Sequence, residues 1–275
     1  MKFKFITSFV LSAGLATGLK AASLVGYWNF DDQSLVNSGT TGSVHDGVSR
    51  NGSVFYSVDT PSGTGRALDL TQNDAYVEIQ NTIGTDANYQ ATFDSGLQNG
   101  MTISVWAKGH PGIWEPYVSK NGEATAENLT GWGYQLRVQE NTNVFTIRGT
   151  AGTDDPTGSV NTNDEDWHMI TGTWNPVTGV RALYVDGVLD IQITGDTGSF
   201  PFPTGEHLLF GNREISTTQN DEAYSSILLD EVRIYNGALD SNAVSELYSA
   251  SLIPEPSVAF MSLIGAAGLV ARRRR

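Results

Sequence analysis

The chain has 275 residues, 39% of them hydrophobic, which suffices for one large core or two small ones and excludes wholesale disorder. It contains no cysteine, which excludes disulfides, thiol nucleophiles and thiolate metal sites. The formal net charge is −14, and seven of the 16 lysines and arginines lie near the two ends, so the acidic central region repels phosphate backbones and excludes nucleic-acid binding.

Residues 1–21 predict a signal peptide. The stretch MKFKFITSFVLSAGLATGLKA has a basic start, an apolar middle and a small-residue finish, and Leu19 and Ala21 fit the −3 and −1 positions of a signal-peptidase site. A first helix of the domain is the alternative, but it would place Lys20 directly beside a strand-like run. We therefore expect export and cleavage after Ala21.

Residues 22–251 predict a single all-β domain. Short apolar runs recur between turn clusters, and in one of them Ile103 and Val105 share a face that we expect to lie in the core. The pair Asp186-Gly187 supplies the positive φ that a two-residue hairpin turn needs. The predicted strands are Leu24–Phe30, Val54–Val58, Arg66–Leu70, Ala75–Ile79, Met101–Lys108, Ile113–Ser119, Gly133–Gln139, Val144–Arg148, Trp167–Trp174, Arg181–Val185, Val188–Ile193, His207–Gly211 and Ile227–Tyr235.

Only one segment of this region has helical character. It is Asp240–Ala250, with Asp240 or Ser241 as the N-cap. The polar stretches Asn81–Asn99 and Gly149–Asp166 predict long loops, and no repeat or linker divides the region. Many short strands and one short helix indicate a two-sheet antiparallel sandwich or jelly roll.

The tail, residues 252–275, differs from the acidic region before it. Pro254-Glu255-Pro256 precedes the charge-free run Ser257–Ala271, and four arginines, Arg272–Arg275, end the chain. A fifteen-residue helix at about 1.5 Å per residue is shorter than a hydrocarbon core of about 30 Å, although arginines at its end favour a short transmembrane helix. A simple tail anchor is one interpretation.

This order of motif, apolar helix and basic terminus resembles the PEP-CTERM sorting signal of Gram-negative bacteria. The resemblance implies that Pro254-Glu255-Pro256 is the sorting motif and that the tail holds the exported protein transiently in the inner membrane. It also implies two processing partners, a signal peptidase and an exosortase that removes the tail. The protein would then reach the cell surface or the extracellular medium.

The motifs of residues 22–251 resemble a family as well. GYWNFDD, RALDLTQNDAYVEI, MTISVWAK, DWHMITGTWNPVTGVRALYVDGVL, LLFGN and LLDEVRIYNGALDSNAVSELY occur in the order typical of LamG-like, concanavalin A-like jelly rolls. The resemblance implies a two-sheet antiparallel jelly roll in which the first and last strands are neighbours. The activities of that family include glycan binding and protein adhesion, so the fold does not determine the function.

The topology implied by this resemblance places a metal-site candidate where the first and last strands meet. Asp31 and Asp32 would lie near Asp230 and Glu231, and carboxylates gathered at one edge favour Ca²⁺. The competing interpretation is that side chains alternate along a strand, so that only half of these acids face one point. The loop Asn37–Gly47 is a second calcium candidate or an ordinary long turn.

Two pairs of aromatic residues suggest a sugar-binding platform. Trp114 lies near Tyr117 and Trp132 near Tyr134, in turn-rich segments with polar neighbours, and sugar faces stack on exposed rings. Large aromatic side chains are nevertheless more often buried than exposed. The other tryptophans, which fall in the family's strand motifs, are predicted to lie in the core: Trp28, Trp106, Trp167 and Trp174.

Catalytic motifs are lacking in the sequence. No strand carries the paired carboxylates of a glycoside hydrolase, the acidic triplet Asp164-Glu165-Asp166 reads as a turn, and His168 reads as structural. The chain has neither metal-ligand histidine spacing nor a G-x-S-x-G elbow. We expect a non-catalytic protein of the cell surface or extracellular matrix that binds carbohydrate or another matrix polymer. A structural or adhesive protein-binding component of the exopolysaccharide matrix is the alternative, and a glycoside hydrolase is third.

Overall fold

The computed structural model describes residues 22–79, 87, 90–94, 97–109, 115–120, 133–147, 155–195, 197–198, 206–213 and 224–252. The predicted signal peptide and residues 253–275 of the tail, with the Pro254-Glu255-Pro256 motif, lie outside these ranges. Within them, no helix has both the length and the apolar character needed to span a bilayer.

Eight of the described strands form one antiparallel sheet, here called sheet A. The last strand, β14 (Leu228–Tyr235), pairs on one side with β6 and on the other with both β1 and β4. The pairing of β1 with β14 confirms that the first and last strands are neighbours. The order is β12 (Val188–Thr194), β11 (Val180–Val185), β10 (His168–Asn175), β6 (Met101–Lys108), β14, β4 (Ala67–Asp69) and β3 (Phe55–Ser57), with β1 (Leu24–Trp28) beside β14.

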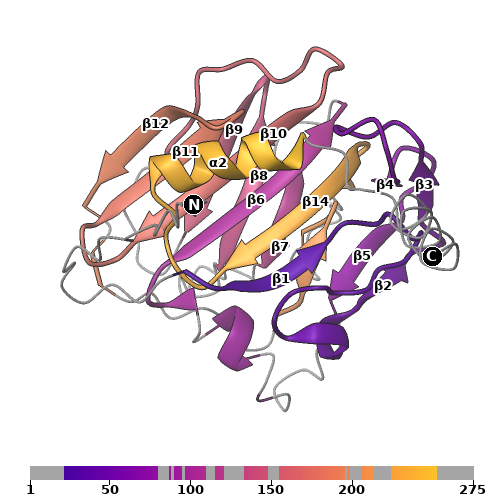
Figure 1. Ribbon diagram of the computed structural model, residues 1–275, viewed down its shortest axis with the longest axis horizontal. Helices are drawn as coiled ribbons and strands as arrows, with labels where there is room; N and C mark the ends of the chain where they lie inside the picture. Colours follow the sequence, from indigo (N-terminus) through magenta and orange to yellow (C-terminus); the bar gives the residue numbers. More distant parts are fainter. Residues whose placement is uncertain are drawn as a thin grey trace, which may run out of the picture.

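Six further strands form sheet B, which lies behind sheet A in Figure 1. Its strands are also antiparallel, so the structure confirms the predicted all-β sandwich of two sheets. The order is β2 (Gly47–Arg50), β5 (Tyr76–Ile79), β13 (Leu208–Phe210), β7 (Pro116–Lys120), β8 (Tyr134–Gln139) and β9 (Thr142–Ile147).

The core lies between the two sheets. Ile103 and Val105 of β6 are fully buried there, as their alternation predicts. Trp28 of β1 bridges the sheets, because its ring lies 5.0 Å from that of Phe210 in β13, edge to face. Elsewhere the sheets approach so closely that a Cβ on Gly172 of β10 would overlap the Phe145 ring of β9.

The outer face of sheet A is partly covered by helix α2 (Ser241–Ser251), which lies across it in Figure 1. Asp240 is the N-cap and accepts a hydrogen bond from the backbone N–H of Ala243 at 2.9 Å. Tyr248 stacks on Trp106 at 5.5 Å, and the Trp106 indole donates to Ser251 Oγ. The helix therefore closes a second, smaller apolar cluster and hides this part of the sheet.

The described part of the chain contains two further short elements, a 3-10 turn, η1 (Gly42–His45), and a π-helical turn, η2 (Gln90–Asp94). The second lies in the stretch that the sequence predicts to be loop. Phe93 of η2 is fully buried against Trp28, with ring centroids 6.4 Å apart. Segment 90–94 therefore contributes a side chain to the core between the two sheets.

Candidate functional site

A β-bulge in β14 creates the first candidate site. Leu228 and Leu229 pair with β4, whereas β14 pairs with β1 from Val232 onward. Where the partner strand changes, the register shifts, and Glu231 adopts φ of 53°. Such a backbone conformation is uncommon for a residue other than glycine, and it turns Asp230 and Glu231 toward the gap between β1 and β4.

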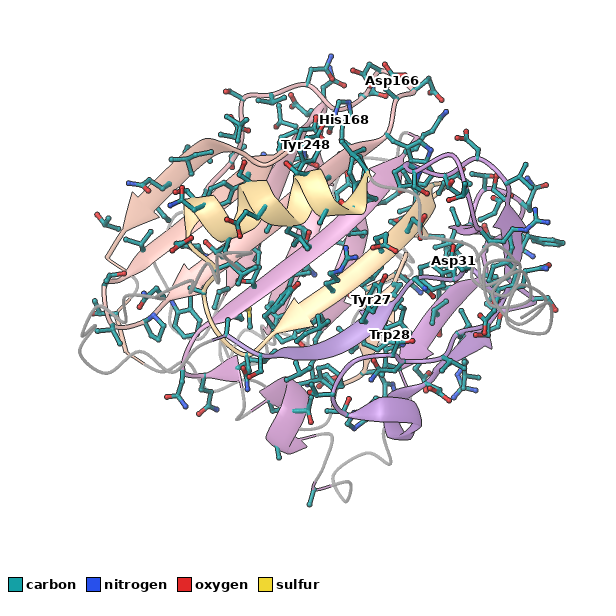
Figure 2. All side chains as sticks on the ribbon, in the orientation of Figure 1. Tyr27, Trp28, Asp31, Asp166, His168 and Tyr248 are labelled. Atoms are coloured by element: carbon teal, nitrogen blue, oxygen red, sulfur yellow. The ribbon has the colours of Figure 1, made fainter. Side chains whose placement is uncertain are left out.

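These two carboxylates line a cavity of about 70 Å³, here called the acid cavity. Asp31, which follows the end of β1 (Figure 2), also lines it. The Asp31 carboxylate accepts a hydrogen bond from the backbone N–H of Arg66, and a Cβ on Gly65 would overlap that carboxylate. The other lining residues are Pro61, Ser62, Thr64, Arg233, Ala250 and Ser251.

The acid cavity stabilises the protonated form of a buried carboxyl group. Asp230 is only 4% exposed, and burial, together with the charges of Glu231 and Asp31, raises its pKa to about 9. The negative charge of Glu231 is compensated, because its carboxylate forms an ion pair with Arg233 and accepts a hydrogen bond from the Tyr27 hydroxyl at 2.8 Å. Its pKa is nevertheless raised by burial.

The structure brings together three of the four predicted metal-site residues. Asp32 is excluded from the acid cavity, since its carboxylate accepts hydrogen bonds from the backbone N–H and the hydroxyl of Ser34. Among the residues that the structure describes, no group of three or more acids or histidines has the arrangement of metal ligands. Asp31 and Asp230 are the carboxylates that a cation in the acid cavity would contact most readily, because the Glu231 carboxylate is already paired with Arg233.

The second calcium candidate, loop 37–47, is fixed by its own hydrogen bonds. Asp46 accepts from the backbone N–H of Asn37 at 2.8 Å, and the Asn37 side chain accepts from the N–H groups of Tyr27 and Gly39. These groups already hold the turn together. The observed contacts are those of the ordinary long turn that the sequence leaves open as an alternative.

The predicted aromatic platform is wrong for the two tyrosines. Tyr117 is 2% exposed and donates to the Asn143 side chain at 2.9 Å, and Tyr134 is 0% exposed and donates to the Phe93 carbonyl. A ring packed in the core presents no face to a sugar. Trp114 and Trp132 lie outside the described residues.

A second candidate site, here called the polar cleft, opens where β4 ends and β14 begins. It has a volume of about 280 Å³. Its base is fixed by the backbone N–H of Leu70, which donates to the Ile227 carbonyl, and by Gly211, where a Cβ would overlap Leu70. Its lining residues are Leu70, Thr71, Gln72, Asn73, Asp74, Tyr224, Ser225 and Ser226.

Local hydrogen bonds hold one wall of the polar cleft in shape. The Asp69 carboxylate accepts from the backbone N–H and the hydroxyl of Thr71, at 2.9 and 2.6 Å. Asn73 accepts from the Ala75 backbone N–H and donates to the Ser53 carbonyl. The wall is therefore preorganised while its polar side chains remain exposed.

The opposite wall adds hydroxyl groups and an aromatic ring. Ser225 donates to the Pro116 carbonyl at 2.8 Å, which fixes that wall to sheet B. The Tyr224 ring lies 6.2 Å from that of Tyr76. Sequence reasoning missed this site, because Thr71–Asp74 resembles any polar turn, and only the fold brings it opposite Tyr224–Ser226.

His168, which is labelled in Figure 2, has a structural role. Its Nδ1 lies 2.8 Å from Asp186 and its Nε2 lies 3.0 Å from Asp164. The hydrogen bond to Asp186, supported by that to Asp164, raises the pKa of His168 to about 9 against the opposing effect of burial. Because both ring nitrogens are held by carboxylates, the imidazole ties the Asp186-Gly187 turn to β10.

Replacing His168 with glutamine is expected to destabilise the protein most at low pH. The folded state binds the imidazole proton more tightly than the unfolded chain, whose histidine pKa is 6.5. This contribution is full below about pH 6.5 and is lost as the pH rises through about 9. Thermal melting of both proteins across this range should show a difference that narrows with rising pH, and a constant difference would contradict the assignment.

Comparisons with known proteins identify the fold. A family model described as the concanavalin A-like lectin/glucanases superfamily (Laminin_G_3) matches residues 71–245. No curated protein matches the chain. Among solved structures, domain 4 of the extracellular GH43 arabinanase AbnA from Geobacillus stearothermophilus, in complex with arabinotriose, has a TM-score of 0.57 at 17% identity, covering 83% of this chain and 100% of that domain.

Two toxin structures are also similar. The binding domain of Paraclostridial Mosquitocidal Protein 1 has a TM-score of 0.59 at 17% identity. A structure of botulinum neurotoxin type C, whose cell entry depends on interaction with two ganglioside molecules, has a TM-score of 0.58 at 15% identity. Each covers 83% of this chain, which spans about half of their length (52% and 51%).

At these identities the solved structures show a shared fold and no more. The family match covers more than half of the 275 residues and includes the strands from β5 to β14. The chain therefore belongs to the concanavalin A-like lectin/glucanases superfamily.

Proposed function

We propose that this protein binds carbohydrate without catalysis and that the polar cleft holds the sugar. The observation that carries the proposal is the lining of the cleft, where exposed hydroxyl, amide and carboxyl groups of residues 71–74 face Tyr224 and Ser226. Sugars present hydroxyl groups in close succession, and such side chains are the hydrogen-bond partners that they require. The arabinotriose and ganglioside named for the structural neighbours support the same class of ligand.

The composition of the polar cleft favours binding over hydrolysis. Glycoside hydrolysis uses two carboxyl groups roughly 5–9.5 Å apart across the scissile bond. Among the described residues that line the cleft, Asp74 supplies the one carboxyl group. His168 is held between two carboxylates, so it does not serve as a free base.

The double variant Gln72→Ala, Asp74→Ala is expected to bind glycan roughly tenfold more weakly than the wild type, because each lost hydrogen bond contributes about 0.5–1.5 kcal/mol. A glycan array should first identify ligands of the purified protein, and calorimetry should then compare the variants. Gln192→Ala is the matched control, since Gln192 is an exposed amide on β12, at the far edge of sheet A.

Other results would favour the other functions. If no glycan binds, an adhesive protein-binding component of the matrix becomes the better explanation. Release of reducing sugar during the titration would indicate a hydrolase. Equal loss of affinity in the Gln192→Ala control would remove the polar cleft as the site.

We further propose that the protein is exported and sorted. The sequence of residues 1–21 supports cleavage by signal peptidase, and residues 252–275 support transient anchoring in the inner membrane until an exosortase acts near Pro254-Glu255-Pro256. The mass and N-terminal sequence of the protein recovered from the cell surface or medium test this. A chain that retains residues 1–21 would contradict it.

A second proposed property is calcium binding in the acid cavity. The observation that favours it is the convergence of Asp31 and Asp230 on a cavity of about 70 Å³. Calcium takes carboxylate, carbonyl and water oxygens, and a cation would keep Asp230 ionised where burial otherwise raises its pKa.

Calcium is expected to raise the melting temperature of the wild-type protein, and EDTA to reverse the increase, because a ligand of the folded state stabilises it. In Asp230→Asn the increase should disappear. Without calcium this variant should be at least as stable as the wild type. Its amide oxygen still accepts the hydrogen bond from the Glu231 backbone N–H, and the amide carries no charge that burial would destabilise. Identical melting with calcium and with EDTA would contradict the proposal.

A further inference from the structure

We infer that the polar cleft selects its ligand by charge: it binds neutral glycans, binds glycans with protonated amino groups more tightly, and rejects glycans that carry carboxylate or sulfate. This inference rests on the proposed function and specifies the class of ligand. It depends on which charged groups line the cleft and which are already paired nearby.

Among the residues that the structure describes, the lining of the polar cleft carries negative charge and no positive charge. The described lining residues are one leucine, one threonine, one glutamine, one asparagine, one aspartate, one tyrosine and two serines. The side chain of Asp74 is exposed, and within the described part of the chain its carboxylate makes no hydrogen bond. Behind the wall lies Asp69, whose carboxylate accepts hydrogen bonds from Thr71 and Gln72.

Two cations on neighbouring elements are engaged elsewhere. Arg50, next to the Asn51 that donates to the Asp74 carbonyl, binds both oxygens of Glu78 at 2.8 and 2.9 Å. Lys108, which pairs with Leu228 at the start of β14, binds Asp59 at 2.8 Å. Neither side chain lines the cleft.

The sequence between Arg213 and Tyr224 contains no basic residue. In the sequence, residues 214–223 contain Glu214, Asp221 and Glu222 and neither lysine nor arginine. Arg213, which precedes them, is not among the residues that line the cleft. Of the described residues that line the cleft, Asp74 is the one that carries a charge.

This distribution of charge decides between ligand classes. An acidic glycan would bring its anion beside Asp74, and none of the described lining residues is a cation that could compensate, which weakens binding. A neutral sugar donates its hydroxyl protons to the Asp74 carboxylate and to the carbonyl oxygens of Gln72 and Asn73 without repulsion. A protonated amine forms a charge-assisted hydrogen bond to Asp74 as well.

The test is a glycan array that includes a matched series on one β-1,4-linked backbone: cellohexaose, the glucosamine hexamer and the glucuronate hexamer. The purified protein should bind neutral and amine-bearing glycans and leave the uronates and sulfated glycans unbound. Preference for acidic glycans would overturn the charge selection and leave carbohydrate binding intact. If no glycan binds at all, the proposed function fails and this inference fails with it.

Two variants, each with a single charge removed, distinguish the effect of the cleft on glycan binding from the effect of the net charge of −14. Asp74→Asn should weaken binding of an amine-bearing glycan by roughly twofold to fivefold, as expected for one exposed ion pair, and should reduce the discrimination against acidic glycans. Glu246→Gln removes one exposed charge on α2 and should change neither. Equal effects of the two variants would show that the overall charge, and not the cleft, selects the ligand.

Discussion

Replacing Lys120 with methionine is expected to lower the free energy of unfolding by about 3–5 kcal/mol, because it leaves an uncompensated acid in the core. Lys120 of β7 is 0% exposed and its ammonium lies 2.7 Å from the Asp94 carboxylate. Burial raises the pKa of Asp94, and the charge of Lys120 opposes that rise. Urea denaturation at neutral pH measures the loss directly.

The double variant Lys120→Met, Asp94→Leu is the informative control. Because it removes both charges, it should recover most of the stability that Lys120→Met loses. Segment 90–94 also positions Phe93 against Trp28, so an unrecovered double variant would mean that the ion pair orients this segment. A loss below about 1 kcal/mol in the single variant would show that Asp94 reaches solvent, contrary to the observed burial.

Replacing Trp28 with alanine is expected to cost about 3–5 kcal/mol. Trp28 is fully buried and its ring joins three elements, since it belongs to β1 and packs on Phe93 of η2 and Phe210 of β13. The structure around a rigid sheet contact relaxes only partly, so the lost ring leaves a cavity.

Phe55→Ala is the matched control for Trp28→Ala. Phe55 is an aromatic residue of sheet A that is 47% exposed on edge strand β3. Its replacement should change stability by at most about 0.5 kcal/mol. If the two variants were equally stable in urea, Trp28 would not lie between two sheets.

The strands of this protein could be predicted because their signals are local. Alternation placed Ile103 and Val105 in the core, and Asp186-Gly187 predicted a turn at the observed position, where Asp186 adopts φ of 51°. By contrast, β2 (Gly47–Arg50) carries one large apolar residue and has no alternation to detect. Segment 90–94 was missed for the same reason, since Phe93 is its only large apolar side chain.

The faces of the sheet B strands could not be predicted from sequence. All five residues of β7 are buried, as are the first five of β8, so neither strand has a solvent face that alternation could reveal. Tyr117 and Tyr134 therefore lie in the core despite their turn-rich neighbourhoods. Buried polar partners hold them there, the Asn143 side chain and the Phe93 carbonyl.

The acid cavity was partly predictable for a topological reason. Pairing of β1 with β14 brings the end of one strand beside the bulge of the other, which explains why Asp31 meets Asp230. Neighbouring side chains diverge, so Asp32 turns to Ser34 instead. The polar cleft could not be predicted from strand pairing alone, because two turns that are distant in sequence form its walls.

The two candidate sites share their framework. The acid cavity lies at the start of β4, next to Gly65, and the polar cleft lies at its end, from Leu70 onward. Along β14, Ser226 precedes the strand at the cleft and Asp230 follows two residues after Leu228 at the cavity. Glycan titrations should therefore be run both with calcium and with EDTA.

The proposal of a glycan in the polar cleft is tested most directly by amide chemical-shift mapping. The isotope-labelled protein would be titrated with the oligosaccharide that the array selects. We predict that the largest shifts occur in residues 71–74 and 224–226 and that those of β12 remain unchanged. The largest shifts on β12 or on α2, with the cleft unaffected, would contradict the account.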